Sequence, residues 1–261
     1  MKKGKKLYEG KAKVIFATDN KDFVIQHFKD DATAFNNQKR AKIEGKGVLN
    51  NRISEYLLSS LALSGIKTHF VKRLNMREQL IKNCEILPIE FVIRNISAGS
   101  MSTRLGVAEG TILKRPIIEY YYKNDDLDDP LVTEEHIDIN GWATNLEIAH
   151  ATETAFRIND FLNGLFRGVS IKLVDFKLEF GRVWNADDSK IILADEISPD
   201  TCRLWDSKDE KKLDKDRFRK GLGGLVEAYT EVAKRLGIMP EGSNIMEIKS
   251  GISKTIKLKK K

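Results

Sequence analysis

Apolar positions in the first ninety residues follow mainly the two-residue period of β-strands. Stretches with strand-like composition occupy residues 5–9, 13–17, 24–28, 68–73, 79–82 and 88–94. Gly10 lies between the first two and indicates a hairpin. From Val48 to Leu61 apolar residues recur instead at helical spacing, and Gly65 is a typical helix stop. The pattern predicts an α+β layer with one helix.

The second part of the chain is richer in helix. After a polar stretch at 123–130 we expect a long helix over 146–166 that ends at Gly168, with a buried stripe at Ala149, Phe156, Leu162 and Phe166. Strands at 171–180 and 190–194, an irregular loop and a final helix over 225–236 complete the prediction. We therefore divide the chain into a strand-rich part at 1–87, an α+β part at 88–248 and a basic tail at 249–261.

Composition favours a globular protein of the cytoplasm. Of 261 residues, 41% are hydrophobic and 32% charged, which excludes a disordered or fibrous chain. No apolar run approaches the ~20 residues needed to cross a bilayer, and the basic N-terminus lacks an apolar signal core. Cys84 and Cys202 are far apart and have no CxxC partner, so we expect neither a disulfide framework nor a structural zinc site.

The net charge of +7 suggests nucleic-acid binding until its location is considered. Six lysines lie in residues 1–13 and six more in 249–261, so the body between them is slightly acidic. A phosphate-backbone site needs basic residues clustered on a folded face. We therefore expect no nucleic-acid partner.

The most informative segment is the predicted strand from Leu173 to Gly181. Alternation places Asp175, Lys177 and Glu179 on the face opposite the apolar residues. A hairpin turn centred on Asp187 would set Glu179 opposite Asp195, where two like charges destabilise a sheet unless something compensates. A divalent cation such as Mg²⁺ is the simplest compensation. Two alternatives stay open: the turn is off-centre by one residue, or Lys177 and other basic groups neutralise the acids.

A second segment, residues 94–102, has the composition of an anion site. A strand ends at Arg94, and Ser100 could cap a short helix that reaches Leu105 and ends at Gly106. A guanidinium, a hydroxyl and backbone N–H groups together suit a phosphate. The alternative is an ordinary helix cap beside a surface arginine.

Two further segments carry charges near these candidates. Lys11 and Lys13 flank the first hairpin and could reach a polyphosphate, although lysines in hairpins are usually just solvated. The loop 195–205 holds further acids and an arginine. The sequence has no GxxxxGK[ST], GxGxxG, HExxH or GxSxG, and its four histidines lack ligand or triad spacing, so nothing supports a Walker-type nucleotidase, dehydrogenase, zinc peptidase or serine hydrolase.

Segments 87–100 and 173–181 together resemble the SAICAR synthetase (phosphoribosylaminoimidazole-succinocarboxamide synthase) family of purine biosynthesis. Segments 6–8, 30–35 and 213–218 extend the resemblance, and all five motifs follow one another along the chain in the order that the family has. The resemblance spans nearly the whole chain. It implies an ATP-dependent ligase that joins L-aspartate to the carboxylate of carboxyaminoimidazole ribonucleotide (CAIR), giving SAICAR, ADP and phosphate. It also implies two α+β parts with ATP between them, the first similar to the nucleotide-binding lobe of protein kinases, and a homo-oligomer, a dimer.

The resemblance also implies residue roles. Lys11 and Lys13 would contact ATP phosphates, and Glu179 and Asp195 would hold Mg²⁺. Arg94, Ser100 and Arg203 would bind the ribonucleotide phosphate. The remaining positions, around the ribonucleotide and its reacting carboxylate, are Lys177, Asp200, Lys215 and Asp216. Asn36-Asn37 departs from the family pattern of Asp or Gly and leaves the contacts to the imidazole carboxylate open.

ATP would convert the carboxylate to an acyl phosphate, which the amine of aspartate then attacks. Asp175 is our candidate for taking the amine proton, and Lys177 for steadying the carboxylate. Two other classes remain: a kinase-type phosphotransferase, which would release a phosphorylated product, and a basic binding module acting through the lysine-rich ends.

Overall fold

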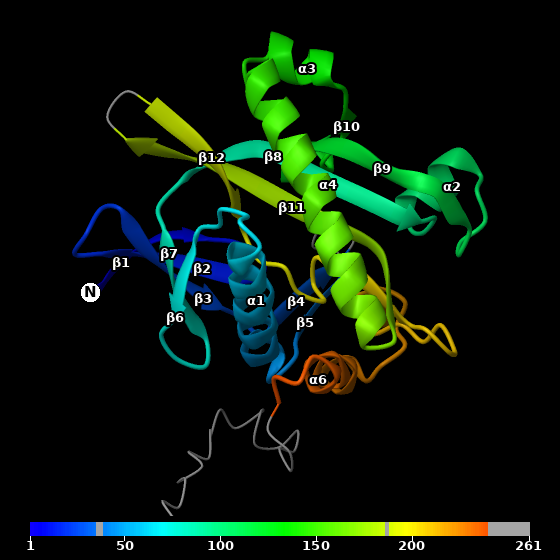
Figure 1. Ribbon diagram of the computed structural model, residues 1–261. Coiled ribbons are helices and arrows are strands. Elements are labelled where there is room, and N and C mark those ends of the chain that lie inside the picture. The colour runs from blue at the N-terminus through cyan, green and yellow to red at the C-terminus, as the bar shows by residue number, and fades with distance from the viewer. Residues whose placement is uncertain (35–38, 186–187, 240–261) are drawn as a thin grey trace, which may run out of the picture.

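Two antiparallel sheets face each other in the computed structural model, which describes residues 1–34, 39–185 and 188–239 (Figure 1). The smaller sheet has the strand order β1-β2-β3-β7-β6. Its strands are β1 (Lys3–Glu9), β2 (Lys13–Thr18), β3 (Phe23–Phe28), β6 (Phe70–Arg73) and β7 (Glu78–Lys82). A separate hairpin is formed by β4 (Asp31–Ala34) and β5 (Lys39–Lys42).

The larger sheet has the order β10-β9-β8-β11-β12, and β13 pairs with β11. Its strands are β8 (Glu85–Ile96), β9 (Ile112–Tyr122), β10 (Leu131–Val132), β11 (Ile171–Asn185), β12 (Asp188–Ala194) and β13 (Cys202–Asp206). The central strand β11 hydrogen-bonds to β8, β12 and β13. Both of its edges are therefore paired along most of its length.

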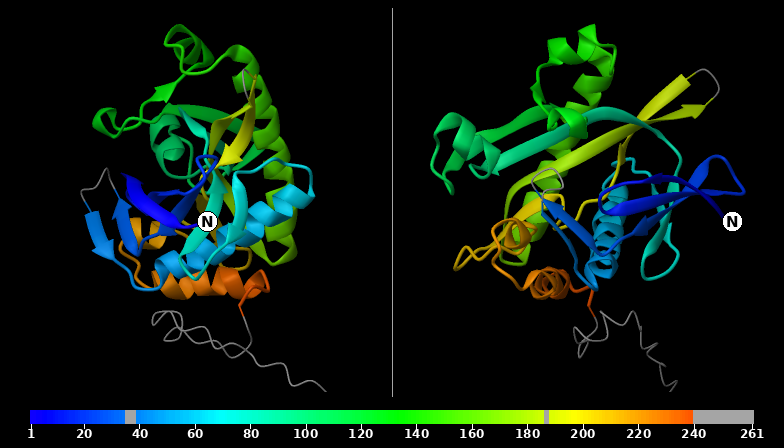
Figure 2. Two further views of the ribbon diagram at one scale, coloured as in Figure 1. Left: turned by 90° about the vertical axis from the view of Figure 1, so that its left-hand side faces the viewer. Right: turned by 180° about the vertical axis from the view of Figure 1, so that it is seen from behind.

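Helices pack on both sheets (Figures 1 and 2). The helical elements are α1 (Lys46–Leu63), α2 (Ser100–Leu105), the 3₁₀ turn η1 (Asp125–Leu127), α3 (Glu134–Ile139), α4 (Asn145–Gly168), α5 (Asp216–Arg219) and α6 (Leu225–Arg235). The long α4 lies across β8, β11 and β12, while α1 packs against β3, β6 and α6. No helix in the described ranges is long and apolar enough to cross a membrane.

The main helices and strands confirm the sequence prediction to within a few residues, but the stripe of α4 differs. Leu162 and Phe166 are buried, whereas Ala149 is exposed, because the true stripe runs through Ile148 and Ala155 at three- and four-residue steps. The helix also includes Gly168. The left-handed residue that follows its end is Ser170, with φ 57°, and not the glycine.

Several short elements were not predicted. The hairpin β4–β5, the strand β9 and helix α3 fall in segments rich in charged residues. The supposed irregular loop after Ala194 contains β13, which pairs with β11, and α5. The predicted boundary at residue 87 falls within β8. One hydrophobic cluster includes residues from both sides of that boundary, such as Leu57 and Phe91.

Candidate functional site

A cleft of about 1070 Å³ lies between the two sheets and is lined by residues of both. The β2 and β3 strands and the β4–β5 hairpin form one wall. Strands β8 and β11, the loop after β12 and the α5 segment form the other. The sheets are joined beside this cleft, because the His69 amide donates to the carbonyl of Leu193 over 2.8 Å. All the predicted site residues line it except Asp216, which lies directly behind it.

The predicted pairing of Glu179 with Asp195 is wrong by one residue. The register pairs Glu179 with Ala194 and Asn185 with Asp188, as the off-centre alternative anticipated. Asp195 follows the end of β12 in a left-handed conformation, with φ 59°, so its side chain leaves the ladder. The carboxylate that does face Glu179 in the sheet is Glu90, on β8.

The two acids nevertheless converge on shared cations. The Nζ atom of Lys177 lies 2.6 Å from Glu179, 2.8 Å from Glu90 and 3.9 Å from Asp195. Lys13 pairs with both Asp195 and Glu196. The second alternative, neutralisation by basic groups, therefore describes the acids as they stand.

These ion pairs control the charge states at the centre of the cleft. Burial alone would raise the pKa of Glu179, but the ammonium groups of Lys177, Lys123 and Lys13 outweigh burial and hold it well below its usual range. Burial lowers the pKa of Lys13, and the nearby acids offset only part of that effect. For Lys177 the charges of Glu179 and Glu90 outweigh burial and raise the pKa. Glu179 is thus fully ionised at neutral pH.

Lys11 lies at the rim of the cleft. Its Nζ atom donates to Asp125 over 2.7 Å, and its side chain is 35% exposed. Both lysines of the predicted hairpin therefore line the cleft, Lys13 in its interior and Lys11 near its opening.

Arg94 and Arg203 form a second cationic group. The Arg94 side chain is only 3% exposed, so the surface-arginine alternative is wrong. Asp175 accepts hydrogen bonds from Nη1 of Arg94 over 2.9 Å and from Nη1 of Arg203 over 2.8 and 3.1 Å. One buried carboxylate thus holds two guanidinium groups side by side.

The short helix α2 confirms its predicted range, but Ser100 is not its cap. Gly99 is the N-cap residue, with φ 58°, and Ser100 is the first helical residue. The Ser100 hydroxyl instead accepts a hydrogen bond from Nη2 of Arg94 over 3.3 Å. A Cβ atom at Gly99 would lie 2.5 Å from Nη2 of Arg203, so glycine is required both for the backbone angle and for the arginine.

The carboxylates of Asp200, which lines the cleft, and of Asp216, which does not, are both engaged by protein groups. The carboxylate of Asp200 accepts from Lys46 Nζ and from the Tyr229 hydroxyl, each over 2.5 Å. Asp216 bridges Nε of Arg203, at 3.0 Å, and Nη1 of Arg219, at 2.6 Å. Lys215, between them in sequence, lines the cleft.

Sequence reasoning missed four charged residues of the cleft region: Glu90, Lys123, Lys46 and Glu119. Lys123 donates to Glu179, and Glu119 accepts from Nε of Arg94 over 2.7 Å. Glu90 and Glu119 occupy alternating positions of strands, which is a usable signal. Lys123 opens a polar stretch and Lys46 opens a helix, so no local pattern distinguishes either from a solvated lysine.

The donor set fits a divalent cation only at the Glu179 and Asp195 carboxylates. Both lie within 4 Å of one ammonium nitrogen, so one cation can be shared between them. Carboxylate oxygens are the protein ligands that Mg²⁺ prefers. Within the described ranges, no three or more His, Cys, Asp or Glu side chains gather in a metal-binding arrangement, here or at any other place, so this pair would leave most of the shell of the ion to water and substrate. His69 is buried beside Lys13, and burial lowers its pKa to about 3, so it stays neutral.

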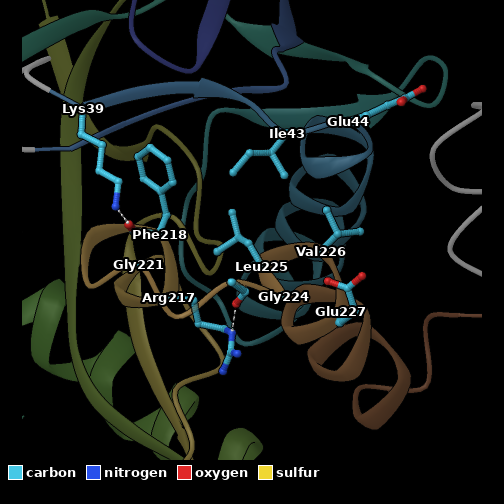
Figure 3. A pocket seen from close by; sticks show the side chains of 11 residues that line it. Lys39, Ile43, Glu44, Arg217, Phe218, Gly221, Gly224, Leu225, Val226 and Glu227 are labelled. Carbon is cyan, nitrogen blue, oxygen red and sulfur yellow. Dashed lines mark hydrogen bonds between the residues drawn. The ribbon is translucent and has the colours of Figure 1, made fainter.

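A second cavity of about 460 Å³ lies between β5 and the start of α6 (Figure 3). Its wall is largely apolar. Its two cations are turned onto protein atoms, because Lys39 donates to the carbonyl of Phe218 over 2.5 Å and Arg217 to that of Gly223 over 2.6 Å. Asn36-Asn37 and the basic tail fall outside the described residues.

An α+β fold whose cleft holds two cationic groups, each paired with carboxylates, is typical of an enzyme for anionic substrates. The comparisons with known proteins specify which. A model of the SAICAR synthetase family matches residues 6–236. A phosphoribosylaminoimidazole-succinocarboxamide synthase of Pelagibacter ubique is 62% identical over 260 residues, covering 100% of both chains.

Solved structures give the same result. The crystal structure of the Ehrlichia chaffeensis phosphoribosylaminoimidazole-succinocarboxamide synthase has 57% identity and a TM-score of 0.89, covering 90% of this chain and 100% of that one. A SAICAR synthetase in complex with ADP has 45% identity and a TM-score of 0.85, covering 90% and 99%. The chain belongs to the SAICAR synthetase family and is an ATP-dependent ligase.

Proposed function

We propose that the enzyme joins L-aspartate to the carboxylate of CAIR and forms SAICAR, ADP and phosphate in purine biosynthesis. Family membership and the ADP bound to a relative of 45% identity support the reaction. The observation that carries the proposal is the meeting, in one cleft, of the Lys13–Lys177 group with its acids and the Arg94–Arg203 pair. These groups suit a triphosphate and a phosphate monoester respectively.

Lys11 and Lys13 bind the ATP phosphates in this proposal, with Lys177 and Lys123 beside them. Glu179 and Asp195 would hold Mg²⁺, which when bound supplies charge neutralisation for the phosphoryl group. The lysines now paired with these acids would then turn toward phosphate oxygens. Because the pKa of Glu179 lies well below its usual range, its carboxylate is ready to bind a cation without losing a proton.

The ribonucleotide phosphate binds Arg94, Arg203 and Ser100. Asp175 holds both guanidiniums in place, and the backbone at Gly99 leaves room for Arg203. Preformed, desolvated arginines bind phosphate with little loss of side-chain entropy. Because all the oxygens of Asp175 are engaged by arginines, the geometry favours this positioning role over the proton transfer suggested from the sequence.

The chemistry proceeds in two displacements. A carboxylate oxygen of CAIR attacks the γ-phosphorus, the bond to the β-phosphate oxygen breaks, and ADP leaves. The amine nitrogen of aspartate then attacks the acyl carbon, the carbon–oxygen bond to phosphate breaks, and phosphate leaves as the nitrogen loses a proton. Lys177 stabilises the carboxylate and acyl oxygens, since it is charged and lies at the centre of the cleft.

The remaining parts of the proposal concern the whole molecule. The β-rich part at 1–87 acts as the nucleotide-binding lobe, similar to that of protein kinases, above the α+β part at 88–248. We propose a cytoplasmic dimer. Cys84 and Cys202 are both free thiols, as expected in a reducing compartment.

Product analysis tests the function. The purified protein is incubated with ATP, Mg²⁺, CAIR and L-aspartate, and products are separated by chromatography and identified by mass. We expect SAICAR, ADP and phosphate in equal amounts, with phosphate release dependent on aspartate. A phosphorylated CAIR that accumulates equally without aspartate would instead identify a kinase and overturn the proposal.

A further inference from the structure

The cleft contains a third cationic group, formed by Lys215 and Arg219 of the α5 segment. It lies next to the Arg94–Arg203 pair, because Asp216 accepts hydrogen bonds from both Arg203 and Arg219. It also lies close to the acids around Lys13 and Lys177. The backbone amide of Lys215 donates to the carbonyl of Pro199 over 3.1 Å, and Pro199 belongs to the loop that begins at Asp195. The third group therefore faces the space between the other two.

Lys215 differs from Lys11, Lys13, Lys123 and Lys177, which pair with acids, in having no such partner. Among residues 1–34, 39–185 and 188–239, no carboxylate lies within ion-pair distance of its Nζ atom and no acceptor within hydrogen-bond distance. Asp200, the acid whose charge acts on it most strongly, is hydrogen-bonded to Lys46 and Tyr229. The half-buried side chain of Lys215 thus lines the cleft without a direct ion pair of its own.

The Lys46–Asp200 pair explains why Lys215 remains unpaired. Lys46 is fully buried at the first position of α1, and its side chain is 1% exposed. A buried ammonium requires a carboxylate, and it takes one oxygen of Asp200 while Tyr229 takes the other. Lys46 therefore acts as a positioning residue, because it holds the Asp200 carboxylate in a contact that Lys215 does not share.

We propose that Lys215 and Arg219 bind the carboxylates of the amino-acid substrate, L-aspartate. This assignment rests on the proposed function. ATP and the ribonucleotide phosphate use the first two cationic groups, and aspartate is the one remaining substrate, with two carboxylates. If the two cations bind the two carboxylates, the amine of aspartate has no partner and stays free to attack the acyl carbon. A dicarboxylate can place one carboxylate on each cation.

Steady-state kinetics of Lys215→Met test the subsite, with the other two substrates saturating in each series. We expect the KM for aspartate to rise about 10-fold or more, because a charge-assisted bond is lost, and those for CAIR and ATP to change less than about 2-fold. Lys215→Arg should recover part of the aspartate affinity. Lys220→Met is the control, since Lys220 adjoins the same helix but pairs with Glu109 outside the cleft.

A binding measurement separates this inference from the reaction itself. Succinate, which is aspartate without its amine, should raise the Tm of the wild type and of Lys220→Met but not of Lys215→Met. If succinate no longer raises the Tm of Lys215→Met, the subsite is supported. If in addition the wild type makes no SAICAR, the proposed reaction is refuted while the subsite is retained. An unchanged aspartate KM, or an unchanged succinate effect in a folded Lys215→Met variant, would overturn the subsite.

Discussion

At the scale of single residues, the function depends on charged groups that hold one another in place before any substrate binds. Glu179 accepts from Lys177 and Lys123, and Asp175 from two arginines. Each buried charge is compensated, so the cleft can be strongly polar within a folded core. Substrate binding would exchange these internal partners for phosphate, metal and carboxylate groups of similar charge.

Glu179→Gln tests the acid at the centre. The amide keeps the shape of the side chain but removes the charge that binds Mg²⁺, so we expect kcat to fall by at least about 100-fold. Calorimetry should show that Mg²⁺ no longer strengthens ADP binding to this variant. Glu109→Gln, an exposed acid outside the cleft, should match the wild type. Near-normal kcat in Glu179→Gln would remove the residue from the metal site.

Gly99→Ala tests the space beside Arg203. The new methyl group would meet the guanidinium at 2.5 Å, and alanine is strained at φ 58°, so the arginine must move. We expect the KM for CAIR to rise about 10-fold or more, measured at saturating ATP and aspartate. Gly106→Ala also places alanine at a positive φ, 65°, in the left-handed helical region, but with nothing within 4 Å, and should lose stability without a change in KM. Equal KM values for the two variants would contradict a role for Gly99 in placing Arg203.

Lys215 should add a pH dependence to aspartate use. Burial lowers its pKa to about 8, with Lys46 and Arg219 acting in the same direction and Asp200 and Glu196 opposing. Its ammonium therefore loses its charge above about pH 8, whereas an arginine there stays charged. The ratio of wild-type to Lys215→Arg kcat/KM for aspartate should fall above that pH, and taking the ratio cancels titration of the substrate amine. A ratio constant from pH 7 to 9.5 would show that this charge does not bind the substrate.

At the scale of elements, the site depends on strand β11 and the segments on either side of it. Predicting it from sequence succeeded where the pattern is local: the alternation in 173–181 identified Asp175, Lys177 and Glu179. It failed where a side chain is placed by register. A shift of one residue moved Asp195 out of the ladder, and Glu90 became the cross-strand neighbour. Short strands such as β13 gain stability from pairing with β11, which a single segment does not reveal.

The helix α4 is fixed to the same strand by Glu147. This residue closes the capping box with Thr144 and accepts from Nε and Nη2 of Arg182, at 2.5 and 2.9 Å. The hydrogen bond from Arg182 is the largest cause that lowers the pKa of Glu147, and the Thr144 amide acts in the same direction. Burial raises the pKa but is outweighed, so the pKa falls to about 2. The helix and the catalytic strand are therefore linked by an ionised carboxylate.

Glu147→Gln should lower the free energy of unfolding by about 1–2 kcal/mol at pH 7. Because the folded-state pKa lies below the unfolded one, this stabilisation is present above about pH 4.5 and disappears as the pH falls toward 2. Urea unfolding of both proteins at pH 7, 4.5 and 3 should show a shrinking difference. Glu231→Gln, in an exposed pair with Arg235, should cost only a few tenths of a kcal/mol. A difference independent of pH would refute the role of the charge.

At the scale of the whole molecule, the sequence predicted the α+β class, the long helices and most strands. Local periodicity was sufficient for these because each buries one clear apolar stripe, as Leu49, Ile53 and Leu57 do in α1. The assembly of the site across two sheets could not be predicted in this way. Lys46 and Lys123 lie far from Asp200 and Glu179 in sequence, and only the closed fold brings each pair together.

The pairing of charges in the fold explains why the net charge of +7 does not by itself indicate a nucleic-acid site. The cleft gathers lysines and arginines, yet almost every one faces a carboxylate, so the site is polar rather than broadly positive. Such a site suits small anions bound at defined positions better than a polyanion, which needs basic residues clustered over a wide face. On the proposed function, one cleft would hold three anionic substrates side by side.

The transfer of oxygen from CAIR to phosphate tests this account most directly. CAIR labelled with ¹⁸O in both carboxylate oxygens is converted with ATP, Mg²⁺ and aspartate, and the phosphate is analysed by mass spectrometry. If the carboxylate attacks the γ-phosphorus and the amine then displaces phosphate, each phosphate carries one ¹⁸O and SAICAR retains the other. Phosphate without label would show that no acyl phosphate forms and would contradict the account.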